Sequence, residues 1–139
     1  MSFAARFIAI TLAALSASSG GAPPIDARAS ASVGAPILVD VTSHAEDATA
    51  KRLTSAVMKE LSGDSRFALA AAGVRGTVNI SLPSGVGWER RLDWTEITYQ
   101  ARLNSATGRS RIVAGHCWNW NLPVCAKQIA NAAAQFSSN

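Results

Sequence analysis

Two cysteines are the residues whose chemistry is easiest to assign. Cys117 and Cys125 are the only cysteines in the chain and stand eight positions apart. This spacing differs from the C-x-x-C pattern of thiol oxidoreductases, and the adjacent His116 would give a zinc site only a third ligand. The pair therefore predicts a structural disulfide, with a redox pair, a metal site and free thiols as alternatives. We expect no cofactor and no bound metal.

Two carboxylates lie close together in a charged segment. Glu89 and Asp93 surround Arg90 and Arg91 in the sequence. Paired acids that flank a glycosidic bond can act as general acid and base, so a small envelope hydrolase is one hypothesis. The adjacent guanidinium groups, however, favour the ionised form of both acids. The pattern is more typical of a solvated, salt-bridged segment, and we expect no catalytic residue.

Four tryptophans are many for so short a chain: Trp88, Trp94, Trp118 and Trp120. The run from residue 118 to residue 121 alternates tryptophan and asparagine. Exposed indoles beside amides are typical of a contact surface for sugar rings or for a protein partner. Alternatively, the rings close the edge of a thin core beside the disulfide, and the small size of the chain favours this second interpretation. The candidate binding residues are Trp118, Asn119, Trp120, Asn121, Arg90 and Arg91.

The first 22 residues have the pattern of a secretory signal peptide. Arg6 is followed by an apolar run at 7–17, which is too short to cross a bilayer of about 30 Å, and then by small residues suited to peptidase cleavage. Residues 23–35, rich in proline, alanine and serine, predict a flexible lead-in. We expect residues 36–139 to form a single α+β domain, without a membrane span once the signal is removed.

The charge of the chain is mildly basic. Thirteen lysines and arginines stand against nine acids, and loss of the signal peptide removes Arg6. This excess is too small and too dispersed for nucleic-acid binding. Export and the cysteine pair together predict an oxidising location, either periplasmic or secreted.

The first half of the domain alternates between strand and helix patterns. Residues 37–42 are rich in β-branched side chains and predict a strand. Ser43 and Glu46 have the spacing of a capping box, so a helix is expected to begin there and to end at Gly63. Its predicted buried stripe consists of Ala50, Leu53, Val57 and Leu61.

The second half predicts further strands and a final helix. Residues 66–70 and 77–82 predict strands, and alternation from Trp94 followed by a polar turn at 104–108 predicts a hairpin that returns over 109–117. Asn121 is the expected N-cap of the last helix. Its predicted apolar stripe is Cys125, Ile129, Ala132 and Phe136. The predicted order is βαβββα, with an antiparallel-rich sheet covered on one face by two helices.

This order of elements resembles that of a group of envelope proteins. Arg66 to Leu69 follow a helix, and Leu103 to Gly108 end a strand in a turn that contains Thr-Gly. Over roughly residues 36–137 the chain resembles the small α/β domains of the TolB amino terminus, LpoB and CsgG-type proteins. The resemblance implies a Gram-negative periplasmic domain that binds other envelope proteins and catalyses nothing. The chain has no lipobox cysteine, and no functional residue transfers.

The sequence thus predicts a non-enzymatic, exported protein-interaction module of the cell envelope. Its partners would be envelope proteins, which the sequence does not identify, and it does not predict an oligomeric state. The alternative is a secreted inhibitor or immunity-type protein that presents the disulfide-held tryptophan loop to one enzyme.

Overall fold

The computed structural model describes residues 34–139. The predicted signal peptide (1–22) and most of the predicted lead-in (23–35) therefore lie outside the described residues. The six strands are β1 (Ile37–Ser43), β2 (Phe67–Leu69), β3 (Val78–Leu82), β4 (Gly87–Arg91), β5 (Trp94–Ser105) and β6 (Ser110–Trp118), and the two helices are α1 (Ala48–Gly63) and α2 (Leu122–Ser138). The α+β class is confirmed. The observed order, βαβββββα, has two strands more than the predicted βαβββα. The five segments predicted as strands correspond to β1, β2, β3, β5 and β6, and β4 is the strand that the sequence pattern did not indicate.

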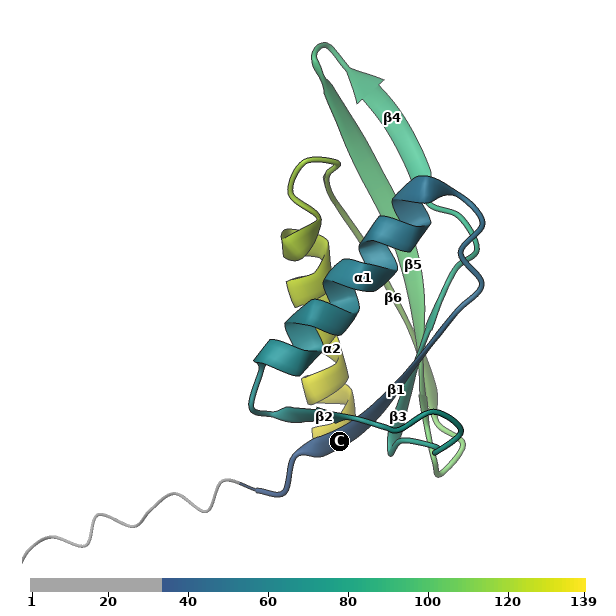
Figure 1. The fold of residues 1–139 in the computed structure, drawn as a ribbon, viewed down its shortest axis with the longest axis vertical. Coiled ribbons are helices and arrows are strands. Elements are labelled where there is room, and N and C mark those ends of the chain that lie inside the picture. Colours follow the sequence, from purple (N-terminus) through teal and green to yellow (C-terminus); the bar gives the residue numbers. More distant parts are fainter. Residues whose placement is uncertain (1–33) are drawn as a thin grey trace, which may run out of the picture. The chain divides into compact units, whose positions relative to one another are not determined.

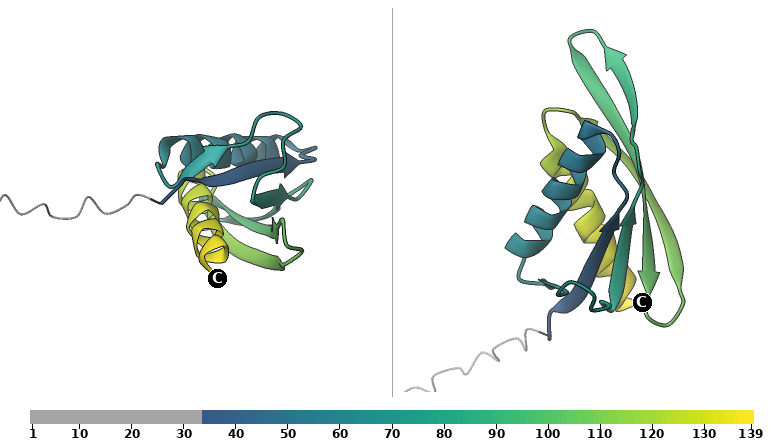
Figure 2. Two further views of the ribbon diagram at one scale, coloured as in Figure 1. Left: turned by 90° about the horizontal axis from the view of Figure 1, so that it is seen from below. Right: turned by 45° about the vertical axis from the view of Figure 1, so that its right-hand side comes forward.

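The six strands form one mixed sheet (Figure 1). β1 pairs in parallel with β2 and β3, whereas β5 pairs antiparallel with β3, β4 and β6. Both helices lie on the same face of this sheet (Figure 2), as the sequence predicts. We call the opposite, uncovered side the open face.

β5 is the organising strand because it is long enough to pair with two strands along a single edge. Its C-terminal part pairs with β3 through Ser81 and Arg102, and its N-terminal part pairs with β4 through Arg91 and Trp94. The other edge of β5 pairs with β6 alone. β4 and the start of β5 consequently project beyond the helices as a hairpin arm (Figure 1).

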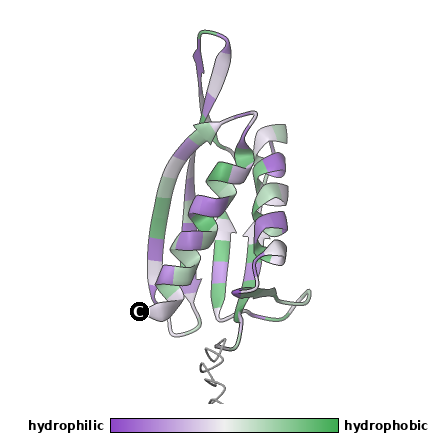
Figure 3. Cartoon of the chain, turned by 90° about the vertical axis from the view of Figure 1, so that its left-hand side faces the viewer, coloured by the Kyte–Doolittle hydropathy of each residue, from purple (hydrophilic) through white to green (hydrophobic). Residues whose placement is uncertain are grey.

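The core lies between the sheet and the two helices. Ile97, Tyr99, Ala101 and Leu103 of β5 are buried, while the residues between them face away, which confirms the predicted alternation. The predicted stripe of α1 is buried throughout. In α2 the buried residues form a wider stripe than predicted, with Ala133 buried and Ala132 only half-buried. Figure 3 shows the resulting alternation of polar and apolar residues along both helices.

The predicted start of the first helix is wrong by several residues. Ser43 ends β1 instead of capping a helix, and its hydroxyl hydrogen-bonds to Thr54 Oγ1 at 2.9 Å. Asp47 is the N-cap, where its Oδ1 accepts from the Ala50 amide at 2.7 Å. The pairing of β1 with β3, which continues to Ser43, outweighs the local capping pattern.

Asp47 also fixes the connection that separates β3 from β4. Its Oδ2 accepts from the amide of Val86 at 3.4 Å, and the amide of Glu46 donates to the carbonyl of Ser84 at 2.8 Å. The start of α1 therefore anchors the break between two strands that share one edge of β5. Such anchoring determines where the hairpin arm leaves the body of the sheet.

Candidate functional site

Exposed tryptophans gather around the end of the sheet from which the hairpin arm projects. Their exposed fractions are 73% for Trp88, 54% for Trp94, 37% for Trp118 and 59% for Trp120. The interpretation that these rings close the core is therefore wrong for Trp88, Trp94 and Trp120. Trp118 is the least exposed of the four rings. The apolar face of α2 and the buried residues of β5 already close the core without them.

Three of the rings form what we call the tryptophan surface: Trp94, Trp118 and Trp120. The ring centroids of Trp94 and Trp120 lie 5.9 Å apart with the planes tilted by 57°. Trp118 is directly opposite Glu96, two residues beyond Trp94 along β5. Residues i and i+2 of a strand lie on the same face, so Trp94 and Trp118 both lie on the open face.

The loop that carries the tryptophan surface is held at several points. The disulfide Cys117–Cys125 joins β6 to α2 immediately beside it, as predicted. The amide of Asn119 donates to the carbonyl of Thr95 at 2.9 Å, and the guanidinium of Arg52 in α1 donates to the carbonyl of Asn119 at 3.2 Å. The loop is therefore tied to β5, α1 and α2 before any partner arrives.

The two candidate arginines lie on opposite faces of the arm. Arg91 is opposite Trp94 and so shares the open face with the tryptophan surface. Arg90 is opposite Thr95 and lies on the other face, together with Trp88. The structure therefore brings Arg91, but not Arg90, onto the face of Trp118.

Arg91 also bridges two acids that face each other across β4 and β5. Glu89 is directly opposite Glu96, an arrangement that is destabilising on its own because like charges repel. Arg91 Nη2 lies 3.1 Å from Glu89 Oε2, and Arg91 Nε lies 2.9 Å from Glu96 Oε2. His116 Nε2 approaches Glu96 Oε1 to 3.9 Å. The pair Arg91–Glu89 belongs to the salt-bridged segment that the sequence predicts, and the pair Arg91–Glu96 extends it to β5.

The two asparagines of the loop, Asn119 and Asn121, are partly enclosed by the fold. Asn121 is the N-cap of α2, although its side chain makes no capping hydrogen bond. Its backbone amide donates to the carbonyl of Trp118 at 2.8 Å. Asn119 and Asn121 are both half-buried. Of the four loop residues, the two tryptophans therefore offer most of the accessible side-chain surface.

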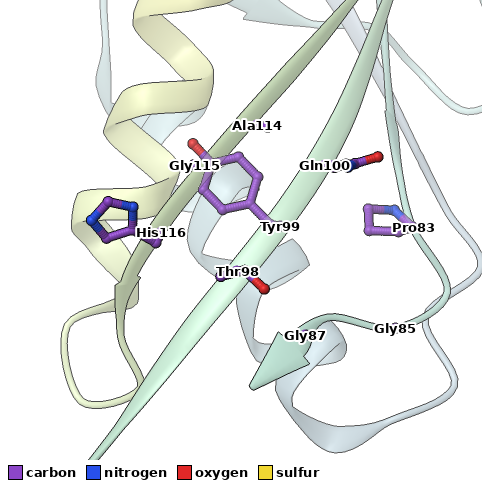
Figure 4. A pocket seen from close by; sticks show the side chains of 9 residues that line it. All are labelled: Pro83, Gly85, Gly87, Thr98, Tyr99, Gln100, Ala114, Gly115 and His116. Carbon is purple, nitrogen blue, oxygen red and sulfur yellow. The ribbon is translucent and has the colours of Figure 1, made fainter. Parts of the chain in front are cut away.

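A shallow hollow lies on the open face beside this cluster (Figure 4). Its lining includes Thr98, Tyr99, Gln100 and His116, together with Pro83 and small residues of β4 and β6. Among residues 34–139 no group of three or more His, Cys, Asp or Glu could hold a metal ion. The hollow offers hydroxyl, amide and imidazole groups to a ligand.

The sequence reasoning missed Trp94, Glu96 and His116 as parts of this site. A signal was present, because Glu96 belongs to the polar side of the alternation that begins at Trp94. The sequence pattern did not indicate β4, and it is this strand that brings Arg91 and Glu89 onto the same edge of β5. Without that strand, residues 88–94 could be interpreted only as a charged connection.

No protein family matches the sequence, and no curated protein matches it. The structure is similar to that of a PelC dodecamer from Paraburkholderia phytofirmans, with 16% identity, a TM-score of 0.43, and coverage of 67% of this chain and 82% of that chain. A point variant of the same PelC dodecamer matches with 14% identity, a TM-score of 0.42, and coverage of 68% and 79%. The sequence resemblance to TolB, LpoB and CsgG-type proteins stays a prediction.

No helix among the described residues is both long and apolar enough to span a membrane.

Proposed function

We propose that this chain is an exported, non-enzymatic protein-interaction module of the cell envelope, and that it binds an envelope partner through the tryptophan surface. The observation that carries the proposal is the exposure of Trp94, Trp118 and Trp120 on a loop and strand that the fold holds in place. Clustered exposed aromatic side chains mark interaction sites, and tryptophan is enriched among the residues that dominate binding energy.

The anchoring of the loop supports this role energetically. Ordering a loop or a large side chain during association costs free energy that is subtracted from affinity. Here the disulfide, the Asn119 amide and Arg52 already restrict the loop. A partner would therefore meet a preformed surface, with Arg91 and the acids that it bridges forming a polar rim.

A matched pair of variants tests the surface. Immobilised wild type, the double variant Trp118→Ala plus Trp120→Ala, and the control Trp88→Ala would each be used to capture proteins from an envelope extract. Trp88 is the most exposed of the four rings and lies on the other face of the arm. We expect the double variant to lose its main partner and Trp88→Ala to keep it. Identical partner profiles for all three proteins would remove the tryptophan surface from the proposal.

The predicted export is tested separately by intact mass. Protein purified from the periplasm should begin between Ser18 and Pro23 and should resist alkylation until it is reduced. A full-length mass with two reactive thiols would contradict both export and an oxidising location.

The preformed loop also suits the alternative, a secreted inhibitor or immunity-type protein. A rigid loop tied by a disulfide to a helix can enter the active site of one enzyme with little loss of entropy. The two functions differ in the number of partners. Tight capture of a single hydrolase, with loss of its activity on binding, would favour the inhibitor over the module.

A further inference from the structure

β6 has one unpaired edge. It is the last strand of the sheet beyond β5, and among residues 34–139 no strand pairs with its other side. Figure 2 shows β6 at the outer border of the sheet. The remaining edges are shorter, since β2 has three residues and β4 has five, whereas β6 has nine.

Hydrogen bonds at the two ends of the β5–β6 hairpin show which residues of β6 face that edge. The amide of Ser105 donates to the carbonyl of Arg109, and the amide of Asn119 donates to the carbonyl of Thr95. Opposite pairs in an antiparallel ladder alternate between hydrogen-bonded and non-hydrogen-bonded. Odd-numbered residues of β6 therefore direct their N–H and C=O groups toward β5, and even-numbered residues direct theirs outward.

The outward groups belong to Ile112, Ala114 and His116 in the middle of the strand. None of their backbone N–H and C=O groups has a partner among the described residues. Native edges are usually blunted by proline, bulges or charged side chains. β6 contains no proline, pairs with β5 through nine successive residues, and carries one formally charged residue, Arg111.

We propose that β6 pairs antiparallel with β6 of a second copy of this chain, about a two-fold axis at Ala114. This register centres the pairing on Ala114, the central residue of β6, and the carbonyl of Trp118 at the end of the strand already accepts from the Asn121 amide. Ala114 would exchange both backbone hydrogen bonds with the second copy's Ala114, and Ile112 would do so with the second copy's His116. The two sheets would join into one continuous sheet.

The side chains near the proposed two-fold axis are small or absent on both faces of β6. On the helix side, half-buried Val113 would be opposite the second copy's Gly115, and such non-hydrogen-bonded pairs approach to about 4.5 Å between Cα atoms. Gly115 presents no side chain of its own to the valine, which would meet Tyr99 and Gln128 above that glycine. On the open face the two small Ala114 side chains would meet at the axis.

The charged side chain of β6 does not oppose pairing with a second copy. Arg111 would be opposite the second copy's Cys117, which places the two arginines six residues apart along the strand. At about 3.4 Å per residue this is about 20 Å, more than a Debye length of about 8 Å in physiological salt. An acidic partner segment would gain little from an edge with a single cation.

Proline at position 114 tests the pairing. The Ala114 amide points outward and makes no hydrogen bond within the described chain, so proline is tolerated there as at other strand edges. We expect wild type to show a concentration-dependent monomer–dimer equilibrium in sedimentation velocity. Ala114→Pro should dissociate at least about tenfold more readily, about 1.4 kcal/mol, with an unchanged circular dichroism spectrum. Ala114→Ser, which keeps the N–H, should behave as wild type.

Cysteine cross-linking is the second test and does not require that the proline variant fold. Cα atoms of a hydrogen-bonded pair lie about 5.5 Å apart, within the range of a disulfide, so Ala114→Cys should form a covalent dimer under mild oxidation. Gln100→Cys is the control, because Gln100 is exposed on the same face one strand inward, about 14 Å from its copy at three strand spacings.

A wild type that stays monomeric at every concentration would overturn the proposal, as would equal cross-linking of the two cysteine variants. The pairing does not depend on the proposed function. A dimer that persists in Trp120→Ala while partner capture is lost would separate the failure of one from the failure of the other.

Discussion

The hydroxyl of Tyr99 in β5 donates a hydrogen bond to Oε1 of Gln128 in α2 at 2.9 Å. The ring crosses over Gly115 of β6, which lies directly opposite Tyr99. A Cβ at position 115 would lie 2.5 Å from the Tyr99 hydroxyl and 2.7 Å from Gln128 Oε1. The glycine therefore leaves the space through which the central strand contacts the last helix.

Replacement of this glycine by alanine should destabilise the fold. In Gly115→Ala the new methyl group would displace both Tyr99 and Gln128, and overpacking of this kind costs about 1–3 kcal/mol. Urea unfolding measures the loss. Gly63→Ala is the control, because nothing lies within 4 Å of a Cβ at that position, and it should unfold like wild type or slightly later. Equal midpoints for both variants would contradict the packing argument.

The disulfide should contribute strongly for so small a domain. Cys117 and Cys125 are both buried, so alanine is a better replacement than serine. Closing a loop of about nine residues stabilises by about 2–3 kcal/mol in the chain-entropy picture. The variant Cys117→Ala plus Cys125→Ala should lose about that amount in denaturant unfolding. Reduced wild type should lose a similar amount, and no change in either sample would show that the loop is held by its hydrogen bonds alone.

The contact between Trp94 and Trp120 should be measurable as a coupling energy. Tilted aromatic pairs contribute about 0.5–1.5 kcal/mol beyond their buried area. A double-mutant cycle with Trp94→Ala, Trp120→Ala and the double variant isolates this term in unfolding free energy. Strictly additive effects would mean that the rings lie side by side without stabilising each other. The pair Trp88→Ala and Trp120→Ala should be additive and serves as the control cycle.

Tyr99 should make the fold sensitive to alkaline pH. Burial raises the pKa of the Tyr99 hydroxyl above its ordinary value of 10.0. Above about pH 10 the unfolded chain releases this proton while the folded chain retains it, so stability is full below pH 10 and falls as the pH rises further. The unfolding free energy of wild type should fall more steeply than that of Tyr99→Phe between pH 9 and about pH 11. Parallel pH curves would contradict this assignment.

The strongly periodic parts of the fold follow from the sequence. The alternation of β5 and the stripe Ala50, Leu53, Val57 and Leu61 of α1 are buried as predicted, because side-chain periodicity directly reports which face meets the core. The start of α1 was predicted wrongly. A serine followed three residues later by glutamate is a local signal, and it gave way to the longer-range pairing of β1 with β3.

The site was less predictable than the fold. The disulfide and the loop at 118–121 could be identified because their residue types are distinctive. β4 could not, since all five of its residues are exposed and it therefore has no buried face to produce a pattern. Its pairing with β5 decides which of Arg90 and Arg91 reaches the tryptophan surface. That choice depends on a register that only the three-dimensional structure provides.

Because β3 and β4 share one edge of β5, the stability of the sheet and the shape of the arm depend on different parts of that strand. The residues that stabilise the body of the sheet pair with the C-terminal part of β5, whereas β4 buries no side chain of its own. Substitutions at Trp88 and Arg90 of β4 should therefore escape most selection for stability, whereas Gly87, Arg91 and Leu92, which has a φ of 51°, are constrained by their contacts or backbone. Recognition can therefore change at these two positions with little effect on folding.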